Sequence, residues 1–148
     1  MIKKILHIVG VLCVALFFGF DVFSKLSQWD EGELELTKMF ALWHINIQSE
    51  SIFEALIDLG MGNVFIVYTT FFVAESIGTL FILFAKKRVL GASILAVTLT
   101  AYTLIMYPFW FSGGATFHDQ ANEYMKNVAI LGALFLLISS SSVKKVYS

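Results

Sequence analysis

The sequence predicts an all-α integral membrane protein in which four transmembrane helices form a bundle with both termini in the cytoplasm. Composition is the first reason, because 58% of the 148 residues are hydrophobic and 14% are charged, whereas soluble domains have roughly 45–50% and about 25%. The second is that the apolar residues form four long runs, and the third is that most basic residues fall on one side of them. A single domain, residues 1–148, is expected, with spans over residues 5–26, 60–85, 89–111 and 126–143.

The first span, residues 5–26, follows Lys3 and Lys4 and is long enough to cross a hydrocarbon core, which takes about 20 apolar residues. A signal peptide has the same basic start, but it ends in a cleavage site of the Ala-x-Ala kind. The sequence offers only the weaker pair Val22 and Ser24 at that point. We therefore expect a retained membrane anchor.

A long connection, residues 27–59, follows on the outer side of the membrane. Its acidic start, DEGELE, precedes apolar residues at spacings of three and four, which is the pattern of an amphipathic helix. This outer amphipathic segment has two interpretations: a cap that lies on the membrane surface and packs on the bundle, or a docking surface or lid. The two patterns consist of Leu36, Met39, Phe40, Trp43 and Ile47, and of Ile52, Phe53, Leu56 and Ile57.

The remaining spans differ in their polar content. Residues 60–85 place Glu75 near the membrane midplane, and residues 89–111 end in a run of aromatic side chains before the turn at Gly113 and Gly114. The last span, residues 126–143, is shorter and contains a serine run. Serine is tolerated there because its hydroxyl bonds back to the carbonyl one turn earlier.

The distribution of basic residues predicts the orientation, because short cytoplasmic loops collect Lys and Arg. With the amino terminus inside, seven of the ten basic residues lie on the cytoplasmic side and nine of the eleven acidic residues lie outside. The seven are Lys3, Lys4, Lys86, Lys87, Arg88, Lys144 and Lys145.

Three ionisable side chains within the spans form the candidate polar site. An ionised residue at the midplane costs roughly 2.5–3.5 kcal/mol on insertion scales, so Glu75 should face the bundle and be paired or protonated. Asp21 and Lys25 lie one helical turn apart and can pair with each other, and Lys25 can extend toward Glu75. These residues form either an ion-pair network that fixes the helix register, or a site for protons, a quinone or another ligand.

A polar stretch, FHDQANEYMKN at residues 117–127, precedes the last span. Most of it is interpreted as a collar where the helix enters the bilayer, with Asn127 placed to reach Glu75 or Lys25 and His118 as a further ligand contact. Tyr107 and Trp110 fit an interfacial aromatic belt or, alternatively, the lining of a quinone slot. A metal site is not expected, because only one imidazole is local.

Several function classes are excluded by counts. A net charge of −1 argues against nucleic-acid binding, which shows a strongly basic face. The single cysteine, Cys13, excludes an internal disulfide and dithiol redox chemistry. Neither paired haem ligands, nor a nucleotide loop, nor a nucleophile–base pair is visible, so we expect no autonomous active site and no intrinsic cofactor.

Five motifs, taken in order and spacing, resemble the DoxX family of small membrane proteins. The likeness covers nearly the whole chain and is strongest from residue 72 to residue 138. One departure is Val22, because family members often carry glycine three residues before the lysine that ends the first helix. The motifs are Glu75-x-x-Gly78-x-Leu80, Arg88, Tyr107-Pro108-Phe109-Trp110, Phe117-His118-Asp119 and Lys126-Asn127-x-Ala129-Ile130-x-Gly132.

The resemblance implies a multi-pass protein of the bacterial cytoplasmic membrane. Some members are subunits of thiosulfate:quinone oxidoreductase, so one expectation is a membrane subunit of a quinone-linked or thiol-related oxidoreductase that works with a redox partner and binds a quinone. Another is a non-enzymatic helper that binds a client protein or a second copy of the chain, and a third is a small transporter. The expected polar pocket comprises Asp21, Lys25, Glu75, Arg88 and Asn127.

Overall fold

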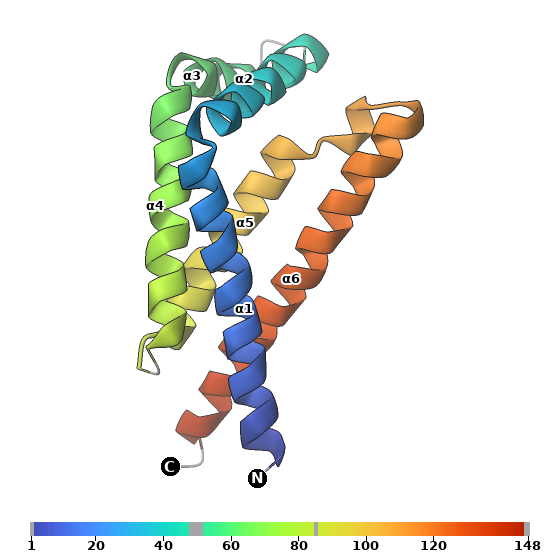
Figure 1. The fold of residues 1–148 in the computed structure, drawn as a ribbon. Coiled ribbons are helices and arrows are strands. Elements are labelled where there is room, and N and C mark those ends of the chain that lie inside the picture. Colours follow the sequence, from blue (N-terminus) through green and yellow to red (C-terminus); the bar gives the residue numbers. More distant parts are fainter. Residues whose placement is uncertain (1, 48–51, 85, 147–148) are drawn as a thin grey trace.

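The computed structural model describes residues 2–47, 52–84 and 86–146, and this part of the chain is all-α. Two shorter helices, α2 (Trp29–Asn46) and α3 (Ile52–Gly62), lie across one end of the molecule, the cap end, and both termini lie at the opposite end, the terminus end (Figure 1). The long helices that connect the two ends are α1 (Ile2–Ser27), α4 (Val64–Leu83), α5 (Arg88–Met106) and α6 (Gly114–Val146), with a short 3₁₀ turn η1 (Phe109–Phe111) before α6.

The four long helices, α5 together with η1, provide four stretches that are long and apolar enough to cross a membrane, as the sequence predicts. The stretches are Ile5–Ser27, Val64–Leu83, Arg88–Phe111 and Gly114–Ser139. Large apolar side chains on these helices are exposed, for example Phe20 at 74% and Leu136 at 71%. Such a surface is unstable in water and is suited to lipid, because burying apolar area is worth about 25 cal/mol per Å².

Three helix boundaries differ from the predicted spans by four residues or more, and one of them is the end of α5 at Met106, five residues before the predicted end at residue 111. The second long helix begins at Val64 and not at residue 60, because α3 continues to Gly62 and the chain changes direction at Asn63. The last helix begins at Gly114, twelve residues before the expected start, so the polar stretch 117–127 lies inside α6. Gly114 has a positive φ of 63°, which lets the chain reverse there and start the helix early.

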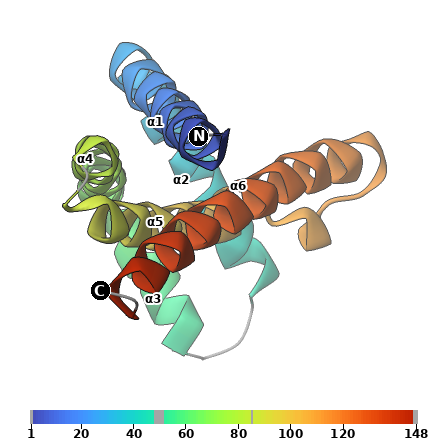
Figure 2. The same ribbon diagram turned by 90° about the horizontal axis from the view of Figure 1, so that it is seen from below.

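Helix α5 lies between α4 and α6 and packs against both (Figure 2). At the closest approach of α4 and α5, the backbone of Gly91 faces the backbone of Gly78 and Ile82. Small residues permit this approach between membrane helices. The apolar core of the four long helices surrounds this contact and includes Phe18, Ile82, Leu95 and Leu134, whose side chains are all 0% exposed.

The cap is fixed to the long helices mainly through α2. Leu36 and Phe40 of α2 are buried, and Met39, Trp43 and Ile47 are half-buried against the same cluster, in agreement with the predicted apolar pattern. In α3 only one residue of the predicted pattern, Ile57, is buried; Ile52, Phe53 and Leu56 are exposed.

A glycine of α2 provides the contact with α4. Gly32 lies directly against the phenol ring and hydroxyl of Tyr68, in the place where any other residue would put its Cβ. Tyr68 itself is 3% exposed and packs edge-on against Trp29, with ring centroids 4.8 Å apart.

Trp43 joins the cap to the end of α5. Its indole Nε1 donates a hydrogen bond to the Ile105 carbonyl oxygen at 3.1 Å, and its ring meets Phe111 edge-on at 5.0 Å. Ile105 is in the last turn of α5, where carbonyls have no partner inside the helix.

Trp43→Phe is expected to lower the free energy of unfolding by about 1 kcal/mol, because the Ile105 carbonyl loses its donor while the ring contacts remain. Thermal unfolding in mild detergent measures the change. Trp110→Phe is the matched control, since Trp110 also meets the Trp43 ring but is 43% exposed and donates no hydrogen bond within the described residues. Equal destabilisation by both variants would contradict the role of the hydrogen bond.

Candidate functional site

Three charged side chains, Asp21, Lys25 and Glu75, meet between α1 and α4 and are called the ion cluster. Lys25 Nζ donates to Asp21 Oδ2 at 2.7 Å and also to Glu75 Oε2. The side chains of Lys25 and Glu75 are 7% and 3% exposed, whereas that of Asp21 is 39% exposed. The predicted pairing of Lys25 with both carboxylates is therefore present.

The helices bring these side chains together for simple geometric reasons. Asp21 and Lys25 are four residues apart, so they occupy the same face of α1. The long lysine stem then lets the ammonium cross from the last turn of α1 to the middle of α4. Lys25 Nζ also lies 4.5 Å from the ring centroid of Tyr102 on α5, which is a cation–π contact.

The charges of the ion cluster do not balance. Two carboxylates surround one ammonium, so the fully ionised cluster carries a net charge of −1. The excess charge is costly where it lies on the buried Glu75 and less so on the half-exposed Asp21. Binding one proton to either carboxyl removes the excess charge, and the cluster can therefore store one proton.

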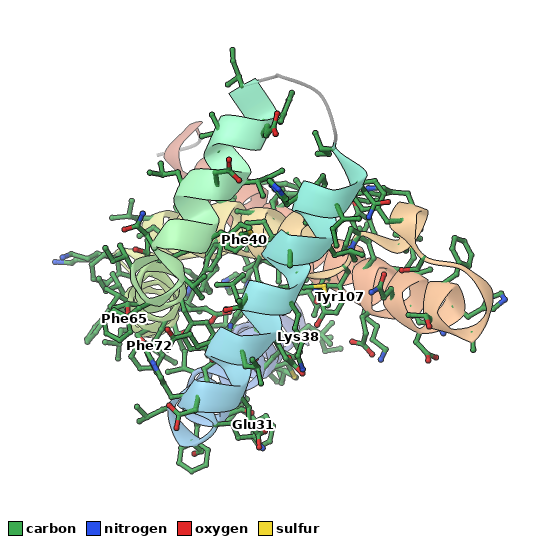
Figure 3. All side chains as sticks on the ribbon, turned by 90° about the horizontal axis from the view of Figure 1, so that it is seen from above. Glu31, Lys38, Phe40, Phe65, Phe72 and Tyr107 are labelled. Carbon is green, nitrogen blue, oxygen red and sulfur yellow. The ribbon has the colours of Figure 1, made fainter. Side chains whose placement is uncertain are left out.

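A polar groove of about 910 Å³ lies at the cap end between α2, the end of α5 and the first turns of α6. Figure 3 shows Lys38 and Tyr107 on the side of α2 that faces α6. The groove offers carboxylates, ammonium groups, amides, a phenol and thioethers. Its lining comprises Glu35, Lys38 and Met39 of α2, Met106 and Tyr107, and Asp119, Gln120, Asn122, Glu123, Met125 and Lys126 of α6.

Two tyrosine rings separate the polar groove from the ion cluster. Tyr107 lines the groove, its ring centroid lies 6.4 Å from that of Tyr102, and Tyr102 carries the Lys25 ammonium on its face. One turn before Tyr107, the Thr103 hydroxyl is buried and has no hydrogen-bond partner within the described residues. The two rings therefore link the groove to the cluster through ring contacts.

A second groove, on the other side of α2, is almost entirely apolar. It has a volume of about 700 Å³ and runs between α2, α3, α4 and α5. Phe40, which lines it, lies on the opposite side of α2 from Lys38 (Figure 3). Aromatic and aliphatic side chains dominate the lining, among them Trp43, Phe53, Ile66 and Leu104. This apolar groove suits a hydrocarbon chain.

Arg88 and Asn127 do not join the ion cluster. Arg88 begins α5 at the terminus end, where its Nη1 lies 2.9 Å from His7 Nε2 and its Nε donates to the Ile82 carbonyl at 3.3 Å. Asn127 is half-buried on α6 and makes no hydrogen bond to Glu75 or Lys25 in the described part of the chain. The expected pocket is thus reduced to Asp21, Lys25 and Glu75.

The other predicted contacts lie at the cap end. Tyr107 lines the polar groove, whereas Trp110 belongs to an aromatic group with Trp43 and Tyr124. His118 is exposed, and its ring meets Phe117. Across the described residues, no three His, Cys, Asp or Glu side chains converge to hold a metal ion.

Several groove residues escaped prediction from the sequence. Glu35 and Lys38 are three residues apart on α2 and lie between the apolar positions of the predicted amphipathic pattern. The opposite wall of the groove was not predicted, because residues 117–127 were expected to form a collar where the helix enters the bilayer and not the first turns of α6.

No protein-family model, curated protein or solved structure matches the chain.

Proposed function

We propose that the chain is a DoxX-like protein of the bacterial cytoplasmic membrane, with its four helices in a bundle and both termini in the cytoplasm. We further propose that it serves as the quinone-binding membrane subunit of an oxidoreductase. The orientation is supported by Lys86, Lys87 and Arg88, which lie at the terminus end with both chain ends, while α2 and its acidic start lie at the cap end.

The observation that carries this proposal is the pair of tyrosine rings, Tyr102 and Tyr107, whose contacts link the ion cluster to a groove large enough for a ligand. A quinone takes two electrons and two protons to become a quinol. Its two carbonyl oxygens accept hydrogen bonds, and the Tyr107 phenol and Lys38 ammonium in the polar groove are available donors.

The ion cluster provides proton chemistry but no electrons. The donors of Lys25 are already directed at Asp21 and Glu75, so the cluster acts beside the quinone and not as its direct ligand. Electrons must come from a partner subunit, since the sequence has one cysteine and no histidine pair placed for haem.

Glu75→Gln tests the proposal directly. Glutamine keeps the shape of the side chain but cannot take up a proton, so the folded variant should reduce quinone about 100-fold more slowly than the wild type, the usual size of a general acid–base contribution. The measurement is quinone reduction by the complex purified in mild detergent, together with extraction of bound quinone. Glu31→Gln, an exposed change on α2, is the matched control and should behave like the wild type.

Two results would overturn this function. One is a wild-type protein that carries no quinone and copurifies with no redox partner. The other is a Glu75→Gln complex that is folded and fully active.

A second candidate function, a helper that binds a client membrane protein, is favoured by one observation. Helix α3 presents a row of exposed apolar side chains at the cap end, including Ile52 at 81%, Phe53 at 67% and Leu59 at 64%. Charged substitutions at Phe53 and Leu59 distinguish the two candidates, because they should release a client protein while leaving quinone binding intact.

A further inference from the structure

The two halves of the helix bundle differ on either side of the ion cluster. Toward the terminus end, the space between the long helices is filled mainly by apolar side chains, with Phe18, Ile82, Leu95 and Leu134 at 0% exposure. The buried polar side chains there include Thr79, whose hydroxyl donates to the Glu75 carbonyl, and Thr98. Glu75 is eight residues before the end of α4, so this apolar half is about 12 Å deep at 1.5 Å per residue.

Toward the cap end, tyrosine hydroxyls and charged side chains are interspersed with the apolar residues of the cap cluster. Glu75 is faced by Asp21 and Lys25 from α1, by Tyr68 from α4 and by Tyr102 from α5. Beyond these groups lie Tyr107 and the polar groove, which is lined by Glu35 of α2 and Glu123 of α6. Asp21 is the most exposed member of the cluster, at 39%.

We propose that the ion cluster exchanges protons with the cap side of the membrane only. In the exchange, a hydronium ion on the cap side gives its proton to one carboxylate, water is left behind, and the charge of the cluster changes from −1 to zero; release is the reverse. The apolar half hinders the same exchange from the terminus side, because its core side chains are packed to 0% exposure and, within the described residues, offer no charged group to a proton or a water molecule.

The proposal fixes the side of the membrane from which protons enter and leave the ion cluster. Any reaction that takes a proton from the ion cluster, or returns one to it, draws that proton from the cap side or delivers it there. This inference rests on the packing of the bundle, and it holds whether or not the ligand in the polar groove is a quinone. Its failure is therefore distinguishable from failure of the proposed function.

Thiol labelling from each side of the membrane tests the proposal in the full-length protein. With Cys13→Ser as background, Ser24→Cys probes the cluster without changing its charges, and Ala96→Cys probes the apolar half, where Ala96 is 6% exposed. Lys38→Cys at the polar groove and Lys87→Cys at the turn before α5 report which side each reagent reaches. The probe is a charged methanethiosulfonate that does not cross membranes, applied to right-side-out and inverted vesicles.

The expected result is labelling of Ser24→Cys from the same side as Lys38→Cys and from no other, with no labelling of Ala96→Cys from either side. Labelling of Ser24→Cys from the Lys87→Cys side, from both sides or from neither would overturn the proposal, as would labelling of Ala96→Cys from any side.

Infrared spectroscopy of the unaltered cluster gives an independent result. In oriented vesicles, a pH step on the cap side should change the carboxyl C=O band that Glu75→Gln abolishes, and the same step on the terminus side should leave that band unchanged. A response to the terminus-side step would overturn the proposal even if a cysteine variant failed to fold.

Discussion

Gly91→Ala is expected to disrupt the packing of α4 against α5 and to leave little folded protein. A Cβ at position 91 would lie 2.7 Å from the Gly78 carbonyl oxygen and 2.7 Å from the Ile82 nitrogen. Both atoms belong to the backbone, so no side-chain rotation relieves the overlap, and one helix must move away from the other. Overpacking usually costs about 1–3 kcal/mol, and this site should be at or above the top of that range.

Thermal unfolding in mild detergent, followed by size-exclusion chromatography, measures this effect. Gly78→Ala should be milder, because the nearest atoms to its new Cβ belong to the flexible Leu95 side chain. Gly10→Ala is the matched control: nothing lies within 4 Å of its new Cβ, and alanine in a helix is favoured over glycine by about 0.5–1 kcal/mol. If Gly91→Ala behaved like Gly10→Ala, the close approach of α4 and α5 would be wrong.

Lys25→Met is expected to have the second-largest effect. The variant leaves Asp21 and the buried Glu75 facing each other without a cation, and removing one partner of a buried ion pair costs about 3–5 kcal/mol. The exposed pair Lys126–Glu123 provides the comparison, since Lys126→Met should change the unfolding free energy by about 0.5 kcal/mol or less. Similar losses for both variants would contradict the burial of the ion cluster.

The double variant Lys25→Met with Glu75→Leu separates stability from function. Replacing a buried ion pair by apolar side chains is often neutral or stabilising, so most of the stability lost in Lys25→Met should return. A stable double variant that fails to reduce quinone would show that the ion cluster is kept for chemistry. A stable double variant with full activity would show that the cluster only holds α1 against α4.

The fold was predictable where one pattern dominates the sequence. Long apolar runs identified the four long helices, and spacings of three and four identified the buried face of α2. Helix α6 was predicted too short because hydropathy marks where the lipid begins and not where the helix begins. Residues 115–125 form no apolar run, but they contain neither glycine nor proline and pack through Phe117 and Tyr124 on Phe109.

The ion cluster was predictable in part, because sequence indicates the depth of a residue in the membrane but not the direction in which it points. Asp21 and Lys25 follow from their spacing, and Glu75 had to find a partner at its depth. Arg88 was included through the family resemblance, although it is thirteen residues after Glu75 and at the far end of the next helix. Asn127 depended on how α6 rotates about its axis, which no pattern in the sequence determines.

The contact between Gly32 and Tyr68 determines which side chains of α2 line each of the two grooves. Because only a residue without a side chain admits the phenol at that position, α2 has a single rotational setting about its own axis. That setting turns Phe40 and Trp43 toward the apolar groove, and Lys38 and Met39 toward the polar one. Helix α2 thus separates the two grooves, with an apolar face toward one and a polar face toward the other. The absence of a side chain at Gly32 determines which face lines which groove.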